Sequence, residues 1–317
     1  SVTVFKLKLL RRREHFFSTA AVVFVVYIVA YLSYNFYTKY SWQYVNWANL
    51  VLFFINALLT LSAFPLIYIL EKFFNLTSDI SLIELLDNEH PLLKRLYEKA
   101  PGTYQHSLQV AIIAEEVAKK IGAHALLVHV GALFHDIGKI EKPEYFTENQ
   151  RDNDNHHQDL SPMESAQLII EHVQIGEKLA REYRLPLEII EFIRTHHGTT
   201  RVEFFYRMYQ NQEPHKALED EHNFRYPGPK PYTREQAILM IADSIEAASR
   251  SLASPTQSEL SKLIETIIAT KIDDKQLSSA PISFRDLDIM KKEILNVLSS
   301  IYHNRIKYPE PRTEMIV

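Results

Sequence analysis

Potential metal ligands occur along the middle of the sequence, and several of them are neighbours. Fourteen of the 317 residues are histidine, and the informative ones stand close to predicted helix ends or to carboxylates. His135-Asp136 and His196-His197 form adjacent pairs, in which two donors at the end of a helix can point into one cavity. The candidate metal ligands fall on five predicted helices and are His106, His135, Asp136, His172, His196, His197 and Asp243.

This combination of donors favours divalent transition metals. Neutral imidazole and carboxylate oxygen suit ions such as Mn, Fe, Co and Zn, and two six-coordinate ions need more donors than one short motif provides. Facing helices of a bundle can supply them. A single histidine is more typical of a capping or solvent-exposed position, whereas adjacent pairs favour a shared site. Two neighbouring cations lower the pKa of a water molecule and neutralise charge on a phosphodiester, so the expected chemistry is phosphodiester hydrolysis.

Three residues near these ligands could bind a phosphorylated substrate. Lys139 follows the first adjacent pair by one short turn and could contact a phosphate oxygen; the alternative is a solvated surface lysine. Arg250 lies two turns beyond Asp243 on the same predicted helix and could bind phosphate or pair with an acid. Tyr226 lies in a proline-rich loop and could stack on a base; the alternative is an ordinary surface loop.

Helices are the elements that must position these residues. Apolar residues at helical spacing predict a helix over 103–121, which follows a break at Pro101-Gly102 and ends at Gly122. Further helices are predicted over about 123–137, 162–181, 186–197, 200–210, 233–253, 257–271 and 285–305. Two polar stretches, 141–161 and 211–232, are predicted to be long loops. Because no alternating strand pattern is present, the sequence predicts an all-α helical bundle.

The first quarter of the chain has the composition of a membrane region. Residues 16–37 and 50–70 contain no Asp, Glu, Lys or Arg, and each is close to the ~20 residues that cross a hydrocarbon core. They predict a hairpin of two transmembrane helices within a membrane region 1–76. Five basic residues precede the first run and one lysine lies between the runs, which places both ends of the hairpin in the cytosol. Because the chain begins at Ser1, we expect it to be a fragment with more sequence upstream.

Residues 77–317 are expected to form the cytosolic catalytic domain. Apolar residues at helical spacing over 77–100 predict a helical connector between the membrane and this domain. The net charge of −4 gives no broad basic field for a nucleic-acid polymer, so phosphate binding must be local. The absence of cysteine excludes disulfides and thiolate ligands. The predicted hairpin and its orientation make this a multi-pass membrane protein, with the lipid bilayer as one partner and the catalytic domain in the cytosol. The expected location is the cytoplasmic (inner) membrane.

Five ordered motifs carry a family resemblance. They are APGTYQHS at 100–107, LFHDIGKIEKPEYFTENQ at 133–150, HHGT at 196–199, FRYPGPKP at 224–231 and AILMIADSIEAASRSL at 237–252. These motifs resemble the HD phosphohydrolase superfamily. Within it, they are similar to the cytosolic domain of the seven-transmembrane HD family, the PgpH-type cyclic di-AMP phosphodiesterases. The similarity runs from about Ser78 to Pro311, and the two membrane runs match the last two helices of that family.

The resemblance implies an HD fold with a site for two metal ions, which are iron or manganese in this family. Matched residue by residue, one ion would bind His106, His135 and Asp243, the other would bind His172, His196 and His197, and Asp136 would bridge them. The implied reaction is the hydrolysis of cyclic di-AMP to linear 5′-pApA. Asp136 and Lys139 would be the catalytic residues.

One further substrate contact depends on the resemblance. His157 stands in the polar loop where the family shows Asn-Pro-His, but this chain has His156 in place of the proline, which puts the loop shape in doubt. His157 could contact the substrate; the alternative is a solvated loop histidine.

Three other functions are considered. A cyclic di-GMP phosphodiesterase of the HD-GYP class has a Gly-Tyr-Pro signature soon after the second pair, where this chain has Gly198-Thr199-Thr200-Arg201. A nucleoside phosphate hydrolase fits the chemistry but does not account for the membrane hairpin. A non-catalytic nucleotide-binding membrane receptor is expected to lack ligands, whereas all seven are present. The oligomeric state is left open, with a homodimer as one option.

Overall fold

The structure, a computed structural model, describes residues 14–40, 45–74, 77–87, 89–150, 156–252 and 255–303. The chain divides into two compact units, Ser1–Asp87 and Asn88–Val317. Both units are helical in their described parts, where the only strand-like pairing is an isolated bridge between Arg201 and Arg225. The predicted all-α fold is therefore confirmed for the described residues. The functional division into a membrane region 1–76 and a cytosolic domain 77–317 stays a prediction.

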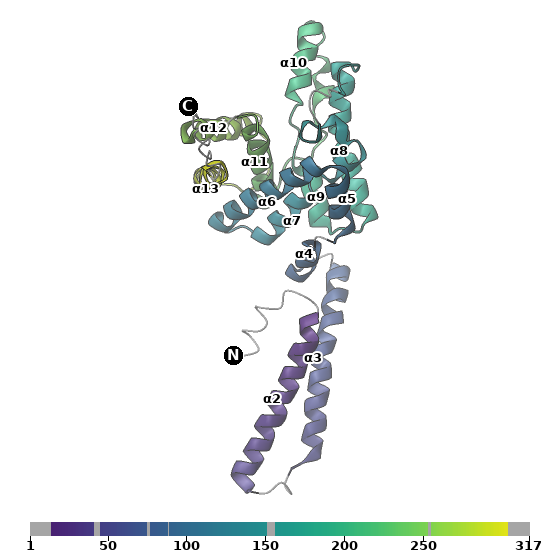
Figure 1. The fold of residues 1–317 in the computed structure, drawn as a ribbon, viewed down its shortest axis with the longest axis vertical. Helices are drawn as coiled ribbons and strands as arrows, with labels where there is room; N and C mark the ends of the chain where they lie inside the picture. Colours follow the sequence, from purple (N-terminus) through teal and green to yellow (C-terminus); the bar gives the residue numbers. More distant parts are fainter. Residues whose placement is uncertain are drawn as a thin grey trace, which may run out of the picture. The chain divides into compact units, whose positions relative to one another are not determined.

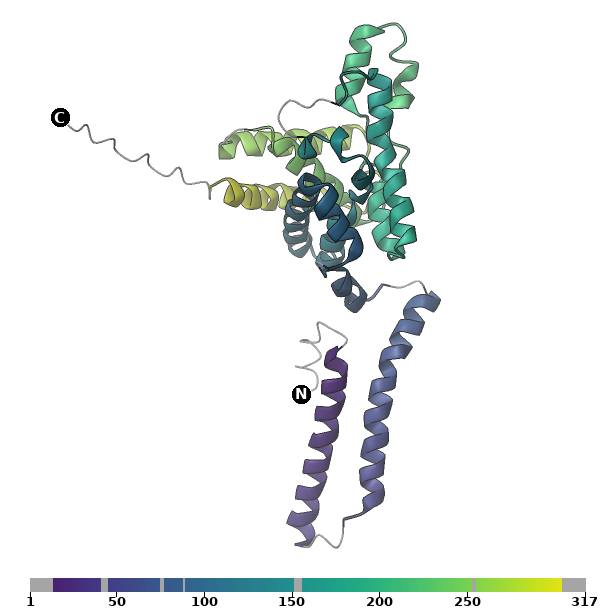
Figure 2. The ribbon, with the colours of Figure 1, turned by 45° about the vertical axis from the view of Figure 1, so that its right-hand side comes forward.

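The described residues of the first unit form two long helices and one short helix. They are α2 (Glu14–Lys39), α3 (Trp47–Phe74) and α4 (Asp79–Leu85). The predicted runs 16–37 and 50–70 lie inside α2 and α3, which pack side by side in opposite directions (Figures 1 and 2). Their aromatic rings meet between the helices, with ring centroids 5.9 Å apart for Phe24 and Phe54 and 5.5 Å apart for Tyr31 and Phe53.

Helix α2 has the length and composition of a membrane span. Its segment Ser18–Lys39 is apolar and long enough to cross a bilayer, while the apolar segment Trp47–Ser62 of α3 is shorter. Large apolar side chains such as Val29 and Leu59 are more than half exposed, which suits a surface facing lipid or other membrane helices. The basic residues used to orient the hairpin precede residue 14 and lie outside the described residues, so the orientation stays a prediction.

The second unit is a bundle of nine described α-helices. They are α5 (Pro91–Lys99), α6 (Pro101–Ile121), α7 (Ala125–Phe134), α8 (Pro162–Glu182), α9 (Leu187–Thr195), α10 (Glu203–Gln212), α11 (Arg234–Ser249), α12 (Gln257–Asp273) and α13 (Phe284–His303). Helices α6 and α7 occupy the middle, with α11, α12 and α13 on one side and α8 and α10 on the other (Figures 1 and 2). Helix α11 is buried along most of its length, so Asp243 is held by the core.

Local sequence signals account for the ends of these helices. Ser161 is the N-cap of α8, and Thr233 is the N-cap of α11. Both form reciprocal capping boxes, in which the N-cap hydroxyl and the N3 side chain each bond the other residue's backbone. Gly122 ends α6 in a left-handed conformation, with φ of 68°, as the sequence predicts. Each of these caps satisfies backbone groups that a helix end leaves without intrahelical partners.

Helix α11 ends at Ser249, before its predicted end at 253, and the two helices that precede the adjacent ligand pairs also end early. Helix α7 ends at Phe134 and α9 ends at Thr195, two or three residues before the predicted ends at 137 and 197. The chain after α7 tightens into a 3₁₀ helix, η2 (Ile137–Glu141), since the backbone must turn there toward α8. The predicted loop 141–161 also contains η3 (Pro143–Tyr145) and η4 (Thr147–Asn149), and the loop 211–232 contains η5 (Asp220–Phe224).

Candidate metal centre

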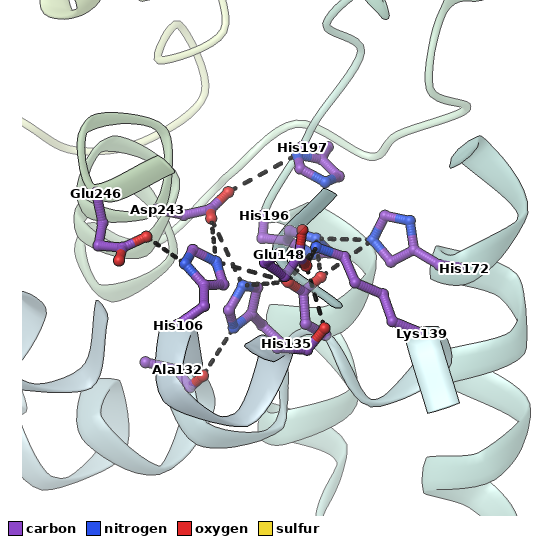
Figure 3. Close-up of polar contacts among 12 residues, drawn as sticks. His106, Ala132, His135, Lys139, Glu148, His172, His196, His197, Asp243 and Glu246 are labelled. Carbon is purple, nitrogen blue, oxygen red and sulfur yellow. Dashed lines mark hydrogen bonds and ion pairs between the residues drawn. The ribbon is translucent and has the colours of Figure 1, made fainter. Parts of the chain in front are cut away.

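All seven predicted ligands converge inside the second unit. They come from α6, the residues directly after α7, α8, the residues directly after α9, and α11 (Figure 3). Six of the seven side chains are buried, and the side chain of His197 is 23% exposed. The site therefore has one side through which a ligand can approach.

Asp136 lies between two groups of histidines. Its Oδ1 atom is 3.3 Å from Nε2 of His172 and 3.6 Å from Nε2 of His196. Its Oδ2 atom is 3.2 Å from Nε2 of His135 and 3.6 Å from Nε2 of His106. Each carboxylate oxygen thus faces a different group, which is the arrangement that a bridging ligand requires.

Asp243 completes the first group and reaches toward the second. Its Oδ1 atom lies 3.0 Å from Nε2 of His106 and 3.6 Å from Nε2 of His135, and its Oδ2 atom lies 3.9 Å from Nδ1 of His197. The donor atoms form two sets, and within each set all atoms lie within 4.8 Å of one another. Asp136 belongs to both sets, which are His106, His135 and Asp136, and Asp136, His172, His196 and His197.

The backbone determines which nitrogen of three histidines carries a proton. Their Nδ1 atoms each donate to the carbonyl oxygen three residues earlier: His135 to Ala132 at 2.7 Å, His172 to Ile169 at 2.6 Å and His196 to Ile193 at 2.7 Å. A carbonyl oxygen can only accept, so Nδ1 holds the proton. The neutral rings therefore direct the lone pair of Nε2 into the site, as metal ligands require.

The positions of these lone pairs fit bound cations. The Nε2 atoms of His172 and His196 are only 3.2 Å apart, and two neutral rings in these tautomers would point lone pairs at each other. Nε2 of His135 and Oδ1 of Asp136 are buried without a hydrogen-bond partner in the described part of the chain. Unpaired buried polar atoms are costly. Bound cations would accept the opposed lone pairs of His172 and His196 and would give Nε2 of His135 and Oδ1 of Asp136 a partner. The donor set thus fits divalent transition-metal ions.

The electrostatics of the two histidine groups differ. Burial lowers the pKa of His196 to about 4 and holds the pKa of His197 well below its ordinary value. Burial acts in the same direction on His135, but the negative charge of Asp136 outweighs it and raises the pKa of His135 to about 10. Although burial acts to raise it, the positive charges of His135 and Lys139 hold the pKa of Asp136 well below its usual range. Protons therefore compete with metal ions for the imidazole of His135.

Lys139 is held against the site by two carboxylates. Its Nζ atom lies 2.7 Å from Oδ2 of Asp136 and 2.8 Å from Oε1 of Glu148, and it stands over the ring of Phe146. The side chain is only 12% exposed, so the alternative of a solvated surface lysine is wrong. Burial opposes the charged form, but the two carboxylates outweigh it and raise the pKa of Lys139, so the amine stays protonated. Contact with a phosphate oxygen stays a prediction.

Tyr226 lies beside the metal ligands. Its ring is 8% exposed and stacks on the ring of His197, with centroids 4.2 Å apart and an interplanar angle of 27°. The alternative of an ordinary surface loop is therefore wrong for Tyr226 itself. His197 covers one face of the ring, so stacking on a base, which stays a prediction, would need the other face.

Arg250 and His157 already have partners of their own. Arg250 donates from Nη2 and Nε to Oε2 of Glu246, at 2.8 and 3.1 Å, which agrees with the predicted alternative of pairing with an acid. Nε2 of His157 lies 2.9 Å from the carbonyl oxygen of Tyr145, and its ring packs on Phe205. Substrate contact by either residue stays a prediction, and His157 is a packed rather than a solvated histidine.

Two acidic residues that the sequence analysis missed contact the site directly. Glu246, which is 1% exposed, accepts a hydrogen bond from Nδ1 of His106. Glu148 bonds Lys139 and accepts from Oγ1 of Thr103 at 3.1 Å. The sequence could have indicated Glu246, since it follows Asp243 by one helical turn in an apolar helix. No sequence pattern indicates Glu148, because a loop separates it from Lys139.

A close approach between backbones fixes one edge of the site. A Cβ atom added to Gly138 would lie 1.9 Å from the carbonyl oxygen of His172 and 2.6 Å from the backbone nitrogen of Gly176. Only glycine fits at residue 138 without moving η2 away from α8.

Comparisons with known proteins agree with this architecture. Residues 103–248 match the HD domain family, and residues 1–78 match the family described as 7TM receptor with intracellular HD hydrolase. The cyclic-di-AMP phosphodiesterases PgpH of Bacillus subtilis and Listeria monocytogenes are 42% and 41% identical to the chain over 240 and 242 residues, or 76% of it in each case. That alignment covers 33% of each relative, so the chain spans about a third of their length.

A solved structure supports the same relationship for the second unit. The crystal structure of the HD domain of L. monocytogenes PgpH in complex with cyclic di-AMP is similar to this chain, with a TM-score of 0.65 and 42% sequence identity. The match covers 69% of this chain and 100% of that HD domain. With both its membrane part and its helical bundle matched, the chain belongs to the family of 7TM receptors with an intracellular HD hydrolase.

Proposed function

We propose that this chain carries the catalytic domain of a membrane-anchored, metal-dependent phosphodiesterase that hydrolyses cyclic di-AMP to linear 5′-pApA. The observation that carries the proposal is the position of Asp136, whose two carboxylate oxygens face two different groups of histidine nitrogens. The names of the PgpH relatives and of the cyclic di-AMP complex support the choice of substrate.

Two ions would be held by the chain's own side chains. His106, His135 and Asp243 would bind one ion, His172, His196 and His197 would bind the other, and Asp136 would bind both. Iron or manganese suits this mixture of imidazole and carboxylate. When bound, such a pair activates water and neutralises charge on a phosphodiester.

The remaining residues would hold the substrate against this site. Lys139 is a protonated amine beside Asp136, so it is placed to offset charge on a phosphate oxygen. Tyr226 forms a wall next to His197 and is placed to limit where a base can lie. Water then adds to phosphorus, the bond from phosphorus to the 3′ oxygen breaks, and that oxygen takes up the proton. The product keeps a 5′-phosphate.

The proposal includes the membrane placement. The match of residues 1–78 to a membrane-receptor family and the apolar segment of α2 support anchoring in the cytoplasmic membrane with the bundle in the cytosol. No homodimer is proposed, since none of the contacts between described residues bears on the oligomeric state.

The test is an activity assay of the purified chain with cyclic di-AMP, cyclic di-GMP and linear dinucleotides, together with metal analysis of the same sample. We expect hydrolysis of cyclic di-AMP and about two ions per chain. Hydrolysis in ¹⁸O-labelled water should put one label on the new 5′-phosphate. A covalent phosphoenzyme or a 3′-phosphate would contradict the reaction, and binding of cyclic di-AMP without turnover would favour the receptor alternative.

A further inference from the structure

His106 differs from the other buried histidine ligands in the partner of its Nδ1 atom. In His135, His172 and His196 this atom donates to a backbone carbonyl, whereas in His106 it donates to the carboxylate of Glu246 (Figure 3). Glu246 contacts Nδ1 of His106, whereas Asp136 and Asp243 lie on the Nε2 side of the ring. Its role must therefore be exerted through His106.

Helix α11 holds the ring of His106 from both sides. Asp243 lies 3.0 Å from Nε2, and Glu246, three residues further along the helix, bonds Nδ1. Residues three apart lie on the same helix face, so one rigid and buried helix supplies both carboxylates. The two closest polar contacts of the ring thus both come from α11.

Glu246 is buried and contacts a second polar side chain besides His106. Arg250, one turn further along α11, donates two hydrogen bonds to the oxygen that accepts from His106. A guanidinium keeps its charge under all ordinary conditions, so the two bonds hold the Glu246 carboxylate oxygen in place with charge-assisted hydrogen bonds. His106 therefore donates to a charged acceptor, and the other three rings donate to neutral ones.

A charged acceptor at Nδ1 makes the imidazole a stronger ligand. A carboxylate that accepts the Nδ1 proton fixes the ring and raises the basicity of Nε2, whereas a carbonyl does so less strongly. The two groups of ligands are consequently unequal. The group with His106 contains the only ring in the described site that is supported by a carboxylate.

We propose that Glu246 is a positioning residue that makes the ion at His106, His135 and Asp243 the more tightly bound of the two. This inference rests on the proposed two-ion site and adds an order of loading, in which the first ion enters this group and the second enters the group of His172, His196 and His197. The first ion neutralises the shared Asp136 and so weakens the attraction for the second.

The test measures metal content, separately from activity. The full chain and its Glu246→Gln variant, purified in detergent, are equilibrated with Mn²⁺ at graded free concentrations, and bound metal is counted by mass spectrometry. Glutamine keeps the size of the side chain and an acceptor oxygen but removes the charge. We expect two binding midpoints for the unaltered chain, and in the variant a shift of the tighter midpoint by about 10–100-fold toward higher concentration.

The control is Glu116→Gln, which removes one partly exposed carboxylate from α6 outside the site and should leave both midpoints unchanged. Unchanged midpoints in Glu246→Gln, or an equal shift of both, would overturn the inference. If Glu246→Gln fails to fold, a second measurement tests the inference on the unaltered chain. A chelator should remove its two ions in a fast and a slow phase. His106→Gln should abolish the slow phase and His172→Gln the fast phase; the reverse assignment, or a single phase in the unaltered chain, would overturn it.

These outcomes separate the inference from the proposed function. A chain that binds two unequal ions but does not hydrolyse cyclic di-AMP contradicts the proposed function and leaves the inference intact. A chain that hydrolyses cyclic di-AMP with two ions of equal affinity contradicts the inference alone. Binding of fewer than two ions contradicts both.

Discussion

Among the individual residues of the site, Asp136 has the most charged and metal-ligating neighbours. Four histidines and one lysine lie within 3.6 Å of its two oxygens. The residue is 1% exposed, so no water from bulk solvent can take over these contacts. Its replacement should affect both ligand groups together.

Asp136→Ala should abolish hydrolysis and most metal binding while helix content stays nearly unchanged, because one carboxylate serves both groups. Metal analysis, circular dichroism and the activity assay on the same sample measure the three properties. Turnover close to that of the unaltered chain would rule out a bridging role for Asp136.

Lys139→Ala distinguishes two roles for the buried amine. If Lys139 stabilises the phosphate in the transition state, kcat should fall by about 10²–10³-fold with metal content unchanged. We expect this result, since the amine contacts only one of the seven candidate ligands. A parallel loss of metal would instead show that Lys139 acts by orienting Asp136.

The histidine pKa values predict how the stability of the metal-free protein depends on pH. His135 has a raised pKa, so the stability that it contributes is complete below pH 6.5 and is lost as pH rises toward about 10. His196 has a lowered pKa, so its contribution is complete above pH 6.5 and is lost as pH falls toward about 4.

Thermal unfolding of the chelator-treated chain, followed by circular dichroism, should therefore show a midpoint that falls on both sides of about pH 6.5. His135→Gln should flatten the alkaline side only. A midpoint that stays constant between pH 6.5 and pH 10 would contradict the assigned shift of His135.

Among the elements, the connection between α12 and α13 supports the second ligand pair. Gln276 in this connection is fully buried, and its Oε1 atom accepts from the backbone nitrogen of Thr199 at 2.9 Å, two residues after His197. Its Nε2 atom donates to Oγ1 of Thr199 at 3.0 Å and to Oδ2 of Asp274 at 2.8 Å. The turn after α9 is therefore tied to a segment 77 residues away in the sequence.

Gln276→Ala should destabilise the bundle by about 1–3 kcal/mol, because it leaves the backbone nitrogen of Thr199 without its partner. It should also weaken metal binding by His197, which the same turn carries. Chemical denaturation measures the first effect and metal titration the second. Gln257→Ala, at an exposed position on α12, is the control and should change the free energy of unfolding by less than about 0.5 kcal/mol. Equal effects of the two substitutions would contradict a supporting role for Gln276.

The predictable part of this architecture is the part that depends on local sequence. Helices such as α8 and α11 follow from apolar spacing and from capping residues, and the ligand pairs follow from residue type. Contacts such as Thr199 to Gln276 and Lys139 to Glu148 could not be predicted, because no short-range pattern relates their partners. The early end of α7 was missed because the apolar residue Ile137 continues the helical spacing past the turn. The early end of α9 was missed because residue spacing alone places helix ends only to within about two to four residues.

At the scale of the whole molecule, all seven candidate ligands and a complete apolar core lie in the unit Asn88–Val317. The match to the isolated HD domain of PgpH covers 69% of the chain. The chain without residues 1–76 should therefore remain folded, bind metal and hydrolyse cyclic di-AMP. Circular dichroism, metal analysis and the activity assay provide the measurements. Aggregation or inactivity of this shortened chain, with an active full chain, would show that the membrane part is required for the catalytic fold.

The close approach of Gly138 to His172 determines which substitutions near the site this chain can accept. Since main-chain atoms approach closely there, the spacing between η2 and α8 is set by atoms that every amino acid shares, apart from the missing Cβ at residue 138. Side chains elsewhere in α8 can then be exchanged during evolution without altering the distance between the two ligand groups. Substitutions on the exposed face of α8 are therefore compatible with an unchanged spacing of the ligands, because backbone atoms set that spacing.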